Sequence, residues 1–189
     1  MDAAEIVRAG LAESAELHRR VAVDRADIVV RAAEVMLEAL SSGRHVLVFG
    51  NGGSATDAQH FAAEMVGRFE RERRAVAVVA LTADTAVLTA VGNDHGYDAV
   101  FARQVEALGR MGDVAMGIST SGASKNVNVA LERAKAKGLV TIGLTGRDGG
   151  ETGRLVHVHV NVPGRTTART QEVHRTLLHL MCELIEPGL

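Results

Sequence analysis

The spacing of apolar residues changes near residue 44 and divides the sequence into two parts. Over residues 2–40, apolar residues recur at roughly the helical period, which predicts helix throughout this stretch. Asp24 can cap a second helical segment, and Ser41-Ser42-Gly43 provides a stop signal. The pattern therefore predicts two consecutive helices within residues 1–43, and we interpret the first as a packing or oligomerisation element.

From residue 44 to 189, short apolar runs rich in β-branched residues alternate with helical patterns, as in strands buried on both faces. The predicted strands are His45–Phe49, Val76–Leu81, Val114–Ile118, Val140–Leu144 and Val156–Val160. The predicted helices are Ala55–Phe69, Thr85–Val91, Ala99–Leu108, Lys125–Lys137 and Thr167–Ile185, and the glycine-rich stretch 146–153 is interpreted as a flexible turn. This alternation predicts an α/β core, in one domain of residues 1–189, with a mostly parallel sheet covered on both faces.

Composition argues against several classes of protein. Of the 189 residues, 47% are hydrophobic but only 3% are aromatic, so the core is aliphatic. A net charge of −2 and the absence of Trp leave neither a basic field nor a stacking platform for nucleic acid. The single cysteine, Cys182, cannot form an internal disulfide. No apolar run approaches the ~20 residues of a membrane span, and the acidic start lacks a signal region, so we expect a cytoplasmic protein with no membrane partner.

Two predicted strands end in loops of glycine and hydroxyl residues that lead into helices. The first loop is Gly50-Asn51-Gly52-Gly53-Ser54, and the second is Ser119-Thr120-Ser121-Gly122-Ala123-Ser124. Backbone N–H groups at such a turn can hold an anion at the helix N-terminus. The first loop has neither the spacing of a dinucleotide fingerprint nor the lysine of a P-loop, and an ordinary turn with glycines at positive φ remains its alternative.

The second loop carries a more specific signal because it places four hydroxyls around one turn. They belong to Ser119, Thr120, Ser121 and Ser124. Capping the helix requires only one of them. The loop contains no lysine or arginine, so an anion would be held by neutral donors and the helix dipole. This arrangement favours a sugar phosphate over a triphosphate.

Acid/base and metal-ligating residues occur in two predicted helices. His60 and Glu64 are four residues apart and share a face; they can bind a metal, form an acid/base unit or be a plain surface pair. Gln171 and His179 are eight residues apart, about 80° around the last helix and roughly 12 Å along it. One ion can reach both only if their side chains lean together or come from different subunits. The alternative for His179 is a core histidine.

Two further polar stretches are less specific. Gly92-Asn93-Asp94-His95-Gly96 ends a predicted helix and is either a simple turn or a polar rim that orients sugar hydroxyls. Glu70-Arg71-Glu72-Arg73-Arg74 is a mixed charge run, for which we predict a solvated loop.

Taken in order, these motifs resemble those of the sugar isomerase (SIS) domain family, and closely those of members that isomerise phosphorylated heptoses. The resemblance spans nearly the whole chain. It is carried by Gly50-Asn51-Gly52-Gly53-Ser54, Asp57-Ala58-Gln59-His60-Phe61-Ala62-Ala63-Glu64, Gly92-Asn93-Asp94, Ser119-Thr120-Ser121-Gly122, Leu144-Thr145-Gly146 and Gln171-Glu172-Val173-His174. It implies a three-layer, flavodoxin-like sandwich with a five-stranded parallel sheet, and a homotetramer with sites at subunit interfaces.

The resemblance also implies an activity and a set of site residues. The activity is aldose–ketose isomerisation of D-sedoheptulose 7-phosphate to D-glycero-D-manno-heptose 7-phosphate through an ene-diol(ate). Glu64 and His179 match the catalytic pair, and His60, Glu64, Gln171 and His179 match the ligands of members that bind one zinc ion per subunit. The positions that match substrate contacts are Asn51, Gly52, Gly53, Ser54, Glu64, Asn93, Asp94, Ser119, Thr120, Ser121, Ser124 and Gln171.

Two alternatives stay open for the sequence alone. One is an isomerase of a different sugar phosphate. The other is a non-catalytic SIS adaptor or sensor of the replication-initiator-associating type, which resembles this chain but lacks the glutamate and histidine pair. Because Glu64 and His179 are both present, the enzyme is favoured. Ala168 departs from members that carry an acidic residue there.

Overall fold

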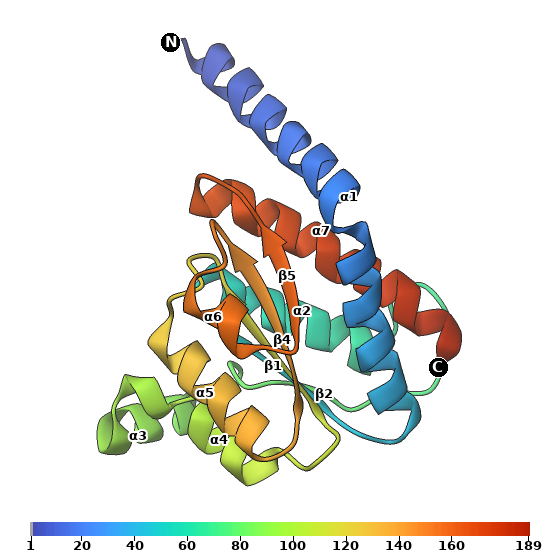
Figure 1. Cartoon of the computed structure of the whole chain (residues 1–189), viewed down its shortest axis with the longest axis vertical. Helices are drawn as coiled ribbons and strands as arrows, with labels where there is room; N and C mark the ends of the chain where they lie inside the picture. The colour runs from blue at the N-terminus through green and yellow to red at the C-terminus, as the bar shows by residue number, and fades with distance from the viewer. Residues whose placement is uncertain (1) are drawn as a thin grey trace.

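The computed structural model describes residues 2–189, and its longest element is α1 (Ala3–Ser41), whose first half projects from the body of the molecule (Figure 1). Asp2 and Glu5 form a capping box at its start, and Gly43 at φ 70° follows its C-cap. The prediction of two helices was wrong, because Asp24 lies exposed inside one continuous helix. No glycine or proline interrupts residues 11–42, so nothing breaks the helical hydrogen bonds there.

The sheet confirms the predicted fold class. Five parallel strands lie in the order β2-β1-β3-β4-β5. Their bounds are β1 (Val46–Gly50), β2 (Val78–Ala80), β3 (Val114–Ser119), β4 (Val140–Gly146) and β5 (Val158–Val162). The direction of winding reverses between β1 and β3, where Gly50 is in register with Ile118. The two glycine and hydroxyl loops therefore begin side by side at the switch point where ligands bind in such sheets.

Helices cover both faces of the sheet, which gives the three layers of Figure 1. One face carries α1, α2 (Gly53–Val66) and α7 (Thr167–Ile185). The other carries α3 (Thr85–His95), a 3₁₀ turn (Tyr97–Ala99), α4 (Ala102–Leu108), α5 (Lys125–Ala136) and α6 (Gly150–Leu155). Alternate residues of β1 serve the two cores, since Val46 and Val48 pack toward α2 and α7 while Leu47 and Phe49 pack toward α4 and α5.

Helix α6 lies where a flexible turn was predicted, so that prediction was wrong. Gly149, at φ 88°, precedes the helix and supplies the left-handed turn that starts it. The helix is held because Thr152 is fully buried and its hydroxyl donates to the Gly122 carbonyl at 3.0 Å. Helix α6 thus packs against the second loop and holds its residue Gly122 in place.

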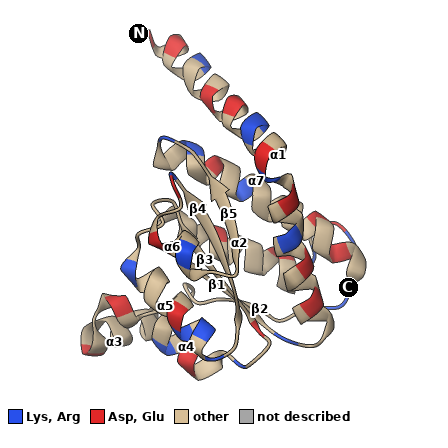
Figure 2. Cartoon of the chain, in the orientation of Figure 1, with Lys and Arg blue, Asp and Glu red and all other residues tan. Residues whose placement is uncertain are grey.

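Charged side chains are distributed over the helices with both signs interspersed, as Figure 2 shows for one face. The expectation of a solvated loop over residues 70–74 fails at Arg73, whose side chain is only 4% exposed because it pairs with the buried Glu186. A second 3₁₀ turn, Glu186–Gly188, follows α7 and carries that glutamate. Within residues 2–189, no helix combines the length and apolar content that a membrane span requires.

Candidate active site

Three side chains that can ligate a metal or move a proton meet between α2 and α7. Nε2 of His60 lies 3.2 Å from Oε1 of Glu64 and 2.9 Å from Nε2 of His179. Single ligand atoms of all three residues lie within 4.8 Å of one another. The ring of Phe69 also stacks on His179, with centroids 5.7 Å apart. The structure thus brings together three of the four residues expected to bind zinc, including both members of the expected catalytic pair.

Local packing explains why this cluster is accessible. Ala58, Phe61 and Met65 form the buried face of α2, which leaves His60 and Glu64 at its edge toward α7. Both are partly exposed, with side chains 36% and 27% accessible. The helical spacing of four residues aligns them, and tertiary packing alone adds the histidine from α7.

Two buried titratable groups near the cluster are held neutral. Burial lowers the pKa of His174 to about 4, although its ring hydrogen-bonds to the Thr145 carbonyl at 2.9 Å. Burial raises the pKa of the Cys182 thiol to about 12, and the negative charges of Glu64 and Glu186 raise it further. His174 is therefore the core histidine of α7, with Nε2 bonded to Thr145 and Nδ1 buried without a partner, and Cys182 serves as a small apolar residue. Neither supplies a charged group to the site.

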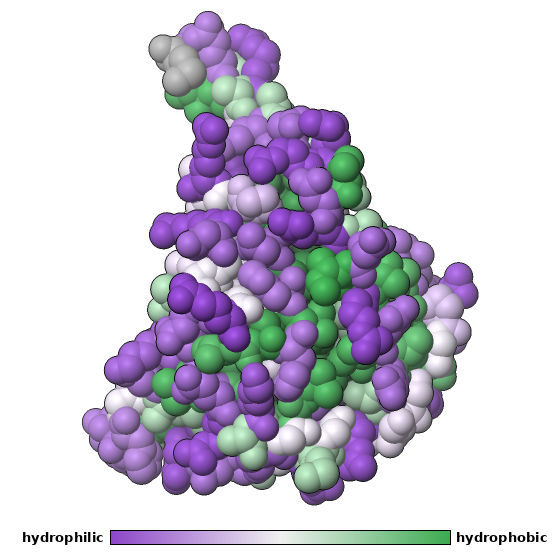
Figure 3. Space-filling model, in the orientation of Figure 1, coloured by the Kyte–Doolittle hydropathy of each residue, from purple (hydrophilic) through white to green (hydrophobic). Residues whose placement is uncertain are grey.

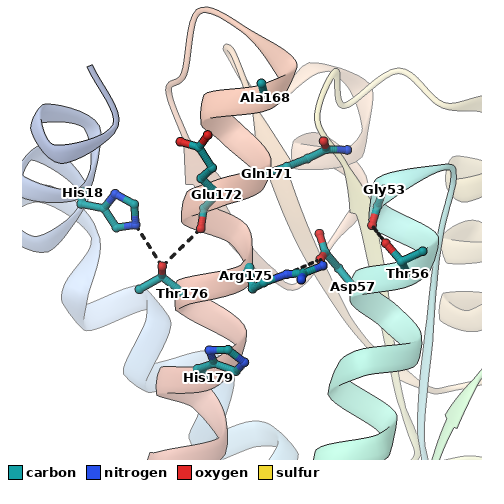
Figure 4. Close-up of a pocket in the computed structure, with 10 residues that line it drawn as sticks. All are labelled: His18, Gly53, Thr56, Asp57, Ala168, Gln171, Glu172, Arg175, Thr176 and His179. Carbon is teal, nitrogen blue, oxygen red and sulfur yellow. Dashed lines mark hydrogen bonds and ion pairs between the residues drawn. The ribbon is translucent and has the colours of Figure 1, made fainter. Parts of the chain in front are cut away.

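A pocket of about 660 Å³ opens beside His179 between α1, α2 and α7 (Figure 4). It is lined by His18, Gly53, Thr56, Asp57, Ala168, Gln171, Glu172, Arg175, Thr176 and His179. Two of the expected site residues, Gln171 and His179, thus share one pocket wall. The ring of His18 reaches from α1 to the Thr176 hydroxyl at 2.9 Å and closes one side.

An ion pair crosses this pocket and was not found from the sequence. Arg175 donates to Asp57 Oδ1 from Nε at 3.1 Å and from Nη2 at 2.6 Å, while the carboxylate side chain is only 3% exposed. Figure 4 shows the pair bridging α2 and α7. The available signal was spacing, because Arg175 lies four residues from both Gln171 and His179 and so shares their side of the helix.

Gln171 lies apart from the three-residue cluster. Its amide packs against Gly53 so closely that a Cβ at that position would collide with it. Gly53 is the first residue of α2, and His60 comes about two turns later. A larger residue at position 53 would push the glutamine side chain aside, and Gln171 lies at the Gly53 end of the pocket, away from His60 and Glu64.

The second loop gathers its hydroxyls as the sequence suggested. The Ser119 hydroxyl lies 2.9 Å from that of Ser124 and 3.4 Å from that of Ser121. Ser124 is the N-cap of α5, yet its side chain makes no capping hydrogen bond. The Ser121 hydroxyl accepts a hydrogen bond from the Ala123 N–H at 3.2 Å, and the Ser124 hydroxyl is not used to cap the helix. Both hydroxyls can still donate to a ligand at the amino end of α5. Thr120 lies between them and is partly buried.

The first loop is tied to the second through its asparagine. The amides of Asn51 and Asn126 exchange two hydrogen bonds, of 2.8 and 2.9 Å, and the Tyr97 hydroxyl donates to Asn51 Oδ1 at 3.0 Å. Gly52 has φ 56°, the positive value considered for this turn, and is exposed. Ser54 is only 3% exposed and is turned into the fold.

The expected site residues form separate groups in one chain. Asn93 donates to Asp94 at 2.8 Å on the exposed last turn of α3. Neither they nor the hydroxyls of the second loop line the pocket of Figure 4, whose wall includes Gly53, Gln171 and His179. The chain thus presents a His60, Glu64 and His179 cluster between α2 and α7 and, separately, a hydroxyl-rich loop at the carboxyl end of the central strand β3.

Comparison with known proteins identifies the relatives of this chain. The sequence model of the SIS domain family matches residues 11–146. The phosphoheptose isomerase of Geobacter metallireducens is 57% identical over 157 residues, which are 83% of each chain. That of Neisseria meningitidis serogroup A is 51% identical over 188 residues, or 98% of this chain and 95% of its own. The solved phosphoheptose isomerase of Neisseria gonorrhoeae superposes with a TM-score of 0.93 at 48% identity, covering 98% of this chain and 100% of that one.

Proposed function

This chain belongs to the SIS domain family, and we propose that it isomerises D-sedoheptulose 7-phosphate to D-glycero-D-manno-heptose 7-phosphate. Relatives about half identical over almost the entire chain are phosphoheptose isomerases. The observation in this molecule that carries the proposal is the meeting of Glu64 and His179 in one cluster, although they lie on different helices. A carboxylate and an imidazole in contact are the equipment that proton transfer at a carbon requires.

The proposed reaction needs no redox partner because hydrogen only changes position within the sugar. Glu64 removes the proton from C1, next to the C2 carbonyl, and an ene-diolate forms across C1 and C2. A proton then returns to C2, while the O1 hydroxyl proton is lost and O2 gains one, with His179 as the acid or second base. The product carries an aldehyde at C1, and both residues return to their starting states.

The second loop is proposed to bind the phosphate. Ser119, Thr120, Ser121 and Ser124 supply neutral donors at the amino end of α5, where the helix dipole favours an anion. Asn51, Gly52, Gly53, Asn93, Asp94 and Gln171 are proposed to contact the rest of the sugar, and the buried Ser54 to support the first loop. Binding energy gained at the phosphate holds the reacting carbons against Glu64, so the phosphate contributes to rate without reacting.

The donor set also fits zinc, one ion per chain. Two imidazole nitrogens and one carboxylate oxygen converge, and nitrogen and oxygen ligands of this kind suit that metal. We propose His60, Glu64 and His179 as ligands. Gln171, which lies apart from them in this chain, would be the fourth ligand if its side chain leans toward His179 or if a neighbouring copy supplies it. Zinc bound there would act as a Lewis acid toward the two sugar oxygens. Glu64 would then serve as ligand and as base in the same cycle, which requires its coordination to loosen during turnover.

We further propose a homotetramer in the cytoplasm. Figure 3 shows apolar surface where α1 runs along the body, and a groove between α1 and α7 is lined by Val21, Val29, Val30, Leu177, Leu180 and Leu184 among others. Such a surface suits a neighbouring copy, which would also bring the separate groups of site residues together at an interface. The buried free thiol of Cys182 suits a reducing compartment.

A direct assay tests the function. Purified protein is incubated with sedoheptulose 7-phosphate, and the C1 proton of an aldose product is followed by NMR, before and after chelation and after return of zinc. We expect an aldose signal that chelation reduces and zinc restores. A protein that leaves this ketose unchanged in every metal state, while it converts another sugar phosphate, would redirect the proposal to that substrate.

A further inference from the structure

The mixed charge run after α2 is anchored by a buried carboxylate from the other end of the chain. Glu186 is only 4% exposed. Its two oxygens accept hydrogen bonds from the backbone N–H groups of Phe69, Glu70 and Arg71, each at 2.9 Å. Burial alone would raise the pKa of this carboxyl, but the three N–H groups and Arg73 lower it, so the group stays charged. A buried anion held in this way fixes the backbone of the loop.

Arg73 completes the arrangement and joins it to α2. Its Nε lies 3.4 Å from Glu186 Oε1, and its side chain is 4% exposed. Its two Nη atoms donate to the carbonyls of Glu64 and Met65, both at 2.8 Å, and of Gly67 at 3.2 Å. These are carbonyls at the end of α2 that have no partner within the helix. Arg73 is therefore a side-chain cap, held in place by Glu186.

Arg73 and Glu186 both contact the segments that carry the proposed catalytic residues, Glu64 and His179. Arg73 holds the backbone of Glu64 itself. Glu186 holds the backbone of Phe69, whose ring stacks on His179 at 5.7 Å and 30°. His179 and Glu186 also lie on one continuous stretch of α7 and its following turn, seven residues apart. The pair thus reaches the two side chains indirectly, through the backbone of Glu64 and through the ring of Phe69.

We propose that Glu186 and Arg73 are positioning residues that set the geometry between Glu64 and His179. The expected kinetic effect rests on the proposed function, whereas the contacts themselves do not depend on that function. Displacement of a reacting group by about 1 Å can cost on the order of 100-fold in rate. Loss of the pair should therefore lower kcat more than it changes KM, because the second loop, which is proposed to bind the phosphate, lies between β3 and α5.

The test compares Glu186→Gln with a matched control, Asp113→Asn. Asp113 is another fully buried carboxylate, and it accepts from the backbone N–H groups of His45 and Arg110 at 2.9 and 2.8 Å, directly before β3 at the amino edge of the sheet. We expect Glu186→Gln to lower kcat about tenfold or more with KM within about twofold. We expect Asp113→Asn to retain kcat per folded molecule although it too lowers the melting temperature. Equal kcat in both variants and the wild type would overturn the proposal.

A second measurement does not depend on activity. The ring current of Phe69 shifts the Cε1 proton of His179, so NMR of that proton reports the stacking directly. We expect the resonance to move in Glu186→Gln and in the milder Arg73→Lys, and to stay in Asp113→Asn. If Glu186→Gln does not fold, Arg73→Lys alone decides by the same two readouts. An unmoved resonance in a folded variant of the pair refutes positioning, whereas a wild type without isomerase activity refutes the proposed function and leaves this readout intact.

Discussion

The Nε2 atoms of His60 and His179 lie 2.9 Å apart, although 119 residues separate the two histidines in the sequence. The parallel sheet causes this approach, because α2 follows β1 and α7 follows β5, and both helices cover the same face. Glu64 joins them through helical spacing alone. Each prediction below depends on this cluster, on the loop proposed to bind the phosphate, or on the packing that supports them.

Replacing Glu64 by glutamine should abolish turnover with little change in substrate binding. The amide keeps the size of the side chain but cannot take up a proton, and a positioned general base contributes about 10²- to 10⁴-fold in rate. Initial rates with sedoheptulose 7-phosphate and calorimetric binding of the same sugar measure the two effects. Glu132→Gln, an exposed change on α5, is the control. A Glu64→Gln enzyme that keeps most of its activity would remove this residue as the base.

Removal of the Ser121 hydroxyl should weaken binding and leave chemistry almost unaffected. A hydrogen bond to a charged group is worth about 1.5–3 kcal/mol, so we expect Ser121→Ala to raise KM by about 10- to 100-fold with a small change in kcat. Ser119→Ala should behave alike, since its hydroxyl lies 3.4 Å from that of Ser121. Ser41→Ala, exposed at the end of α1, is the control. Unchanged KM values in both loop variants would argue against this loop as the phosphate site.

Zinc binding should depend on His60. We expect one zinc ion per chain by elemental analysis and calorimetry, and at least a tenfold weaker affinity in His60→Ala, because a lost imidazole leaves two of the three converging donors. His95→Ala removes an exposed histidine on α3 and should bind zinc as the wild type does. Equal affinity of the two variants would place the metal elsewhere or nowhere.

The free energy of unfolding should decrease as the pH is lowered, because His174 is buried in its neutral form. Its pKa is lowered from 6.5 to about 4 by burial, so the unfolded state binds the proton more tightly and protonation favours unfolding. The contribution is fully present above pH 6.5, is lost as the pH falls toward about 4, and amounts to about 3 kcal/mol. Urea unfolding at several pH values measures it. His174→Gln keeps a donor for the Thr145 carbonyl and should flatten this part of the profile, whereas exposed His95→Gln should not.

The fold was largely predictable from the sequence, because strands buried on both faces and amphipathic helices leave direct periodic signals. The range of α7 was predicted as it is observed, Thr167–Ile185. The failures occurred where long-range contacts decide local structure. Helix α6 forms because Thr152 binds the second loop, and Asp24 caps nothing because α1 packs on the body as one helix.

The sequence indicated which side chains could ligate a metal or move a proton, but it did not indicate how they come together. Spacing within α2 paired His60 with Glu64, but no local rule links them to His179 or Asp57 to Arg175. The burial of Arg73 by Glu186 was equally hidden, since a charge run ordinarily indicates a solvated segment. These contacts join residues that are distant in the chain, and only the packing of α2 against α7 creates them.

The association of several copies should depend on the apolar side of α7. Leu184 is 45% exposed beside the groove between α1 and α7, and we expect Leu184→Glu to convert a tetramer into smaller species, because a charge resists burial at an interface. Light scattering after gel filtration measures the change. Leu108→Glu is the matched control, because Leu108 is 48% exposed on α4, which covers the opposite face of the sheet. Because the phosphate loop and the acid/base cluster do not share one pocket within a chain, loss of the tetramer should also reduce activity at least tenfold relative to Leu108→Glu. A wild-type protein that is monomeric and fully active would contradict a site shared between copies.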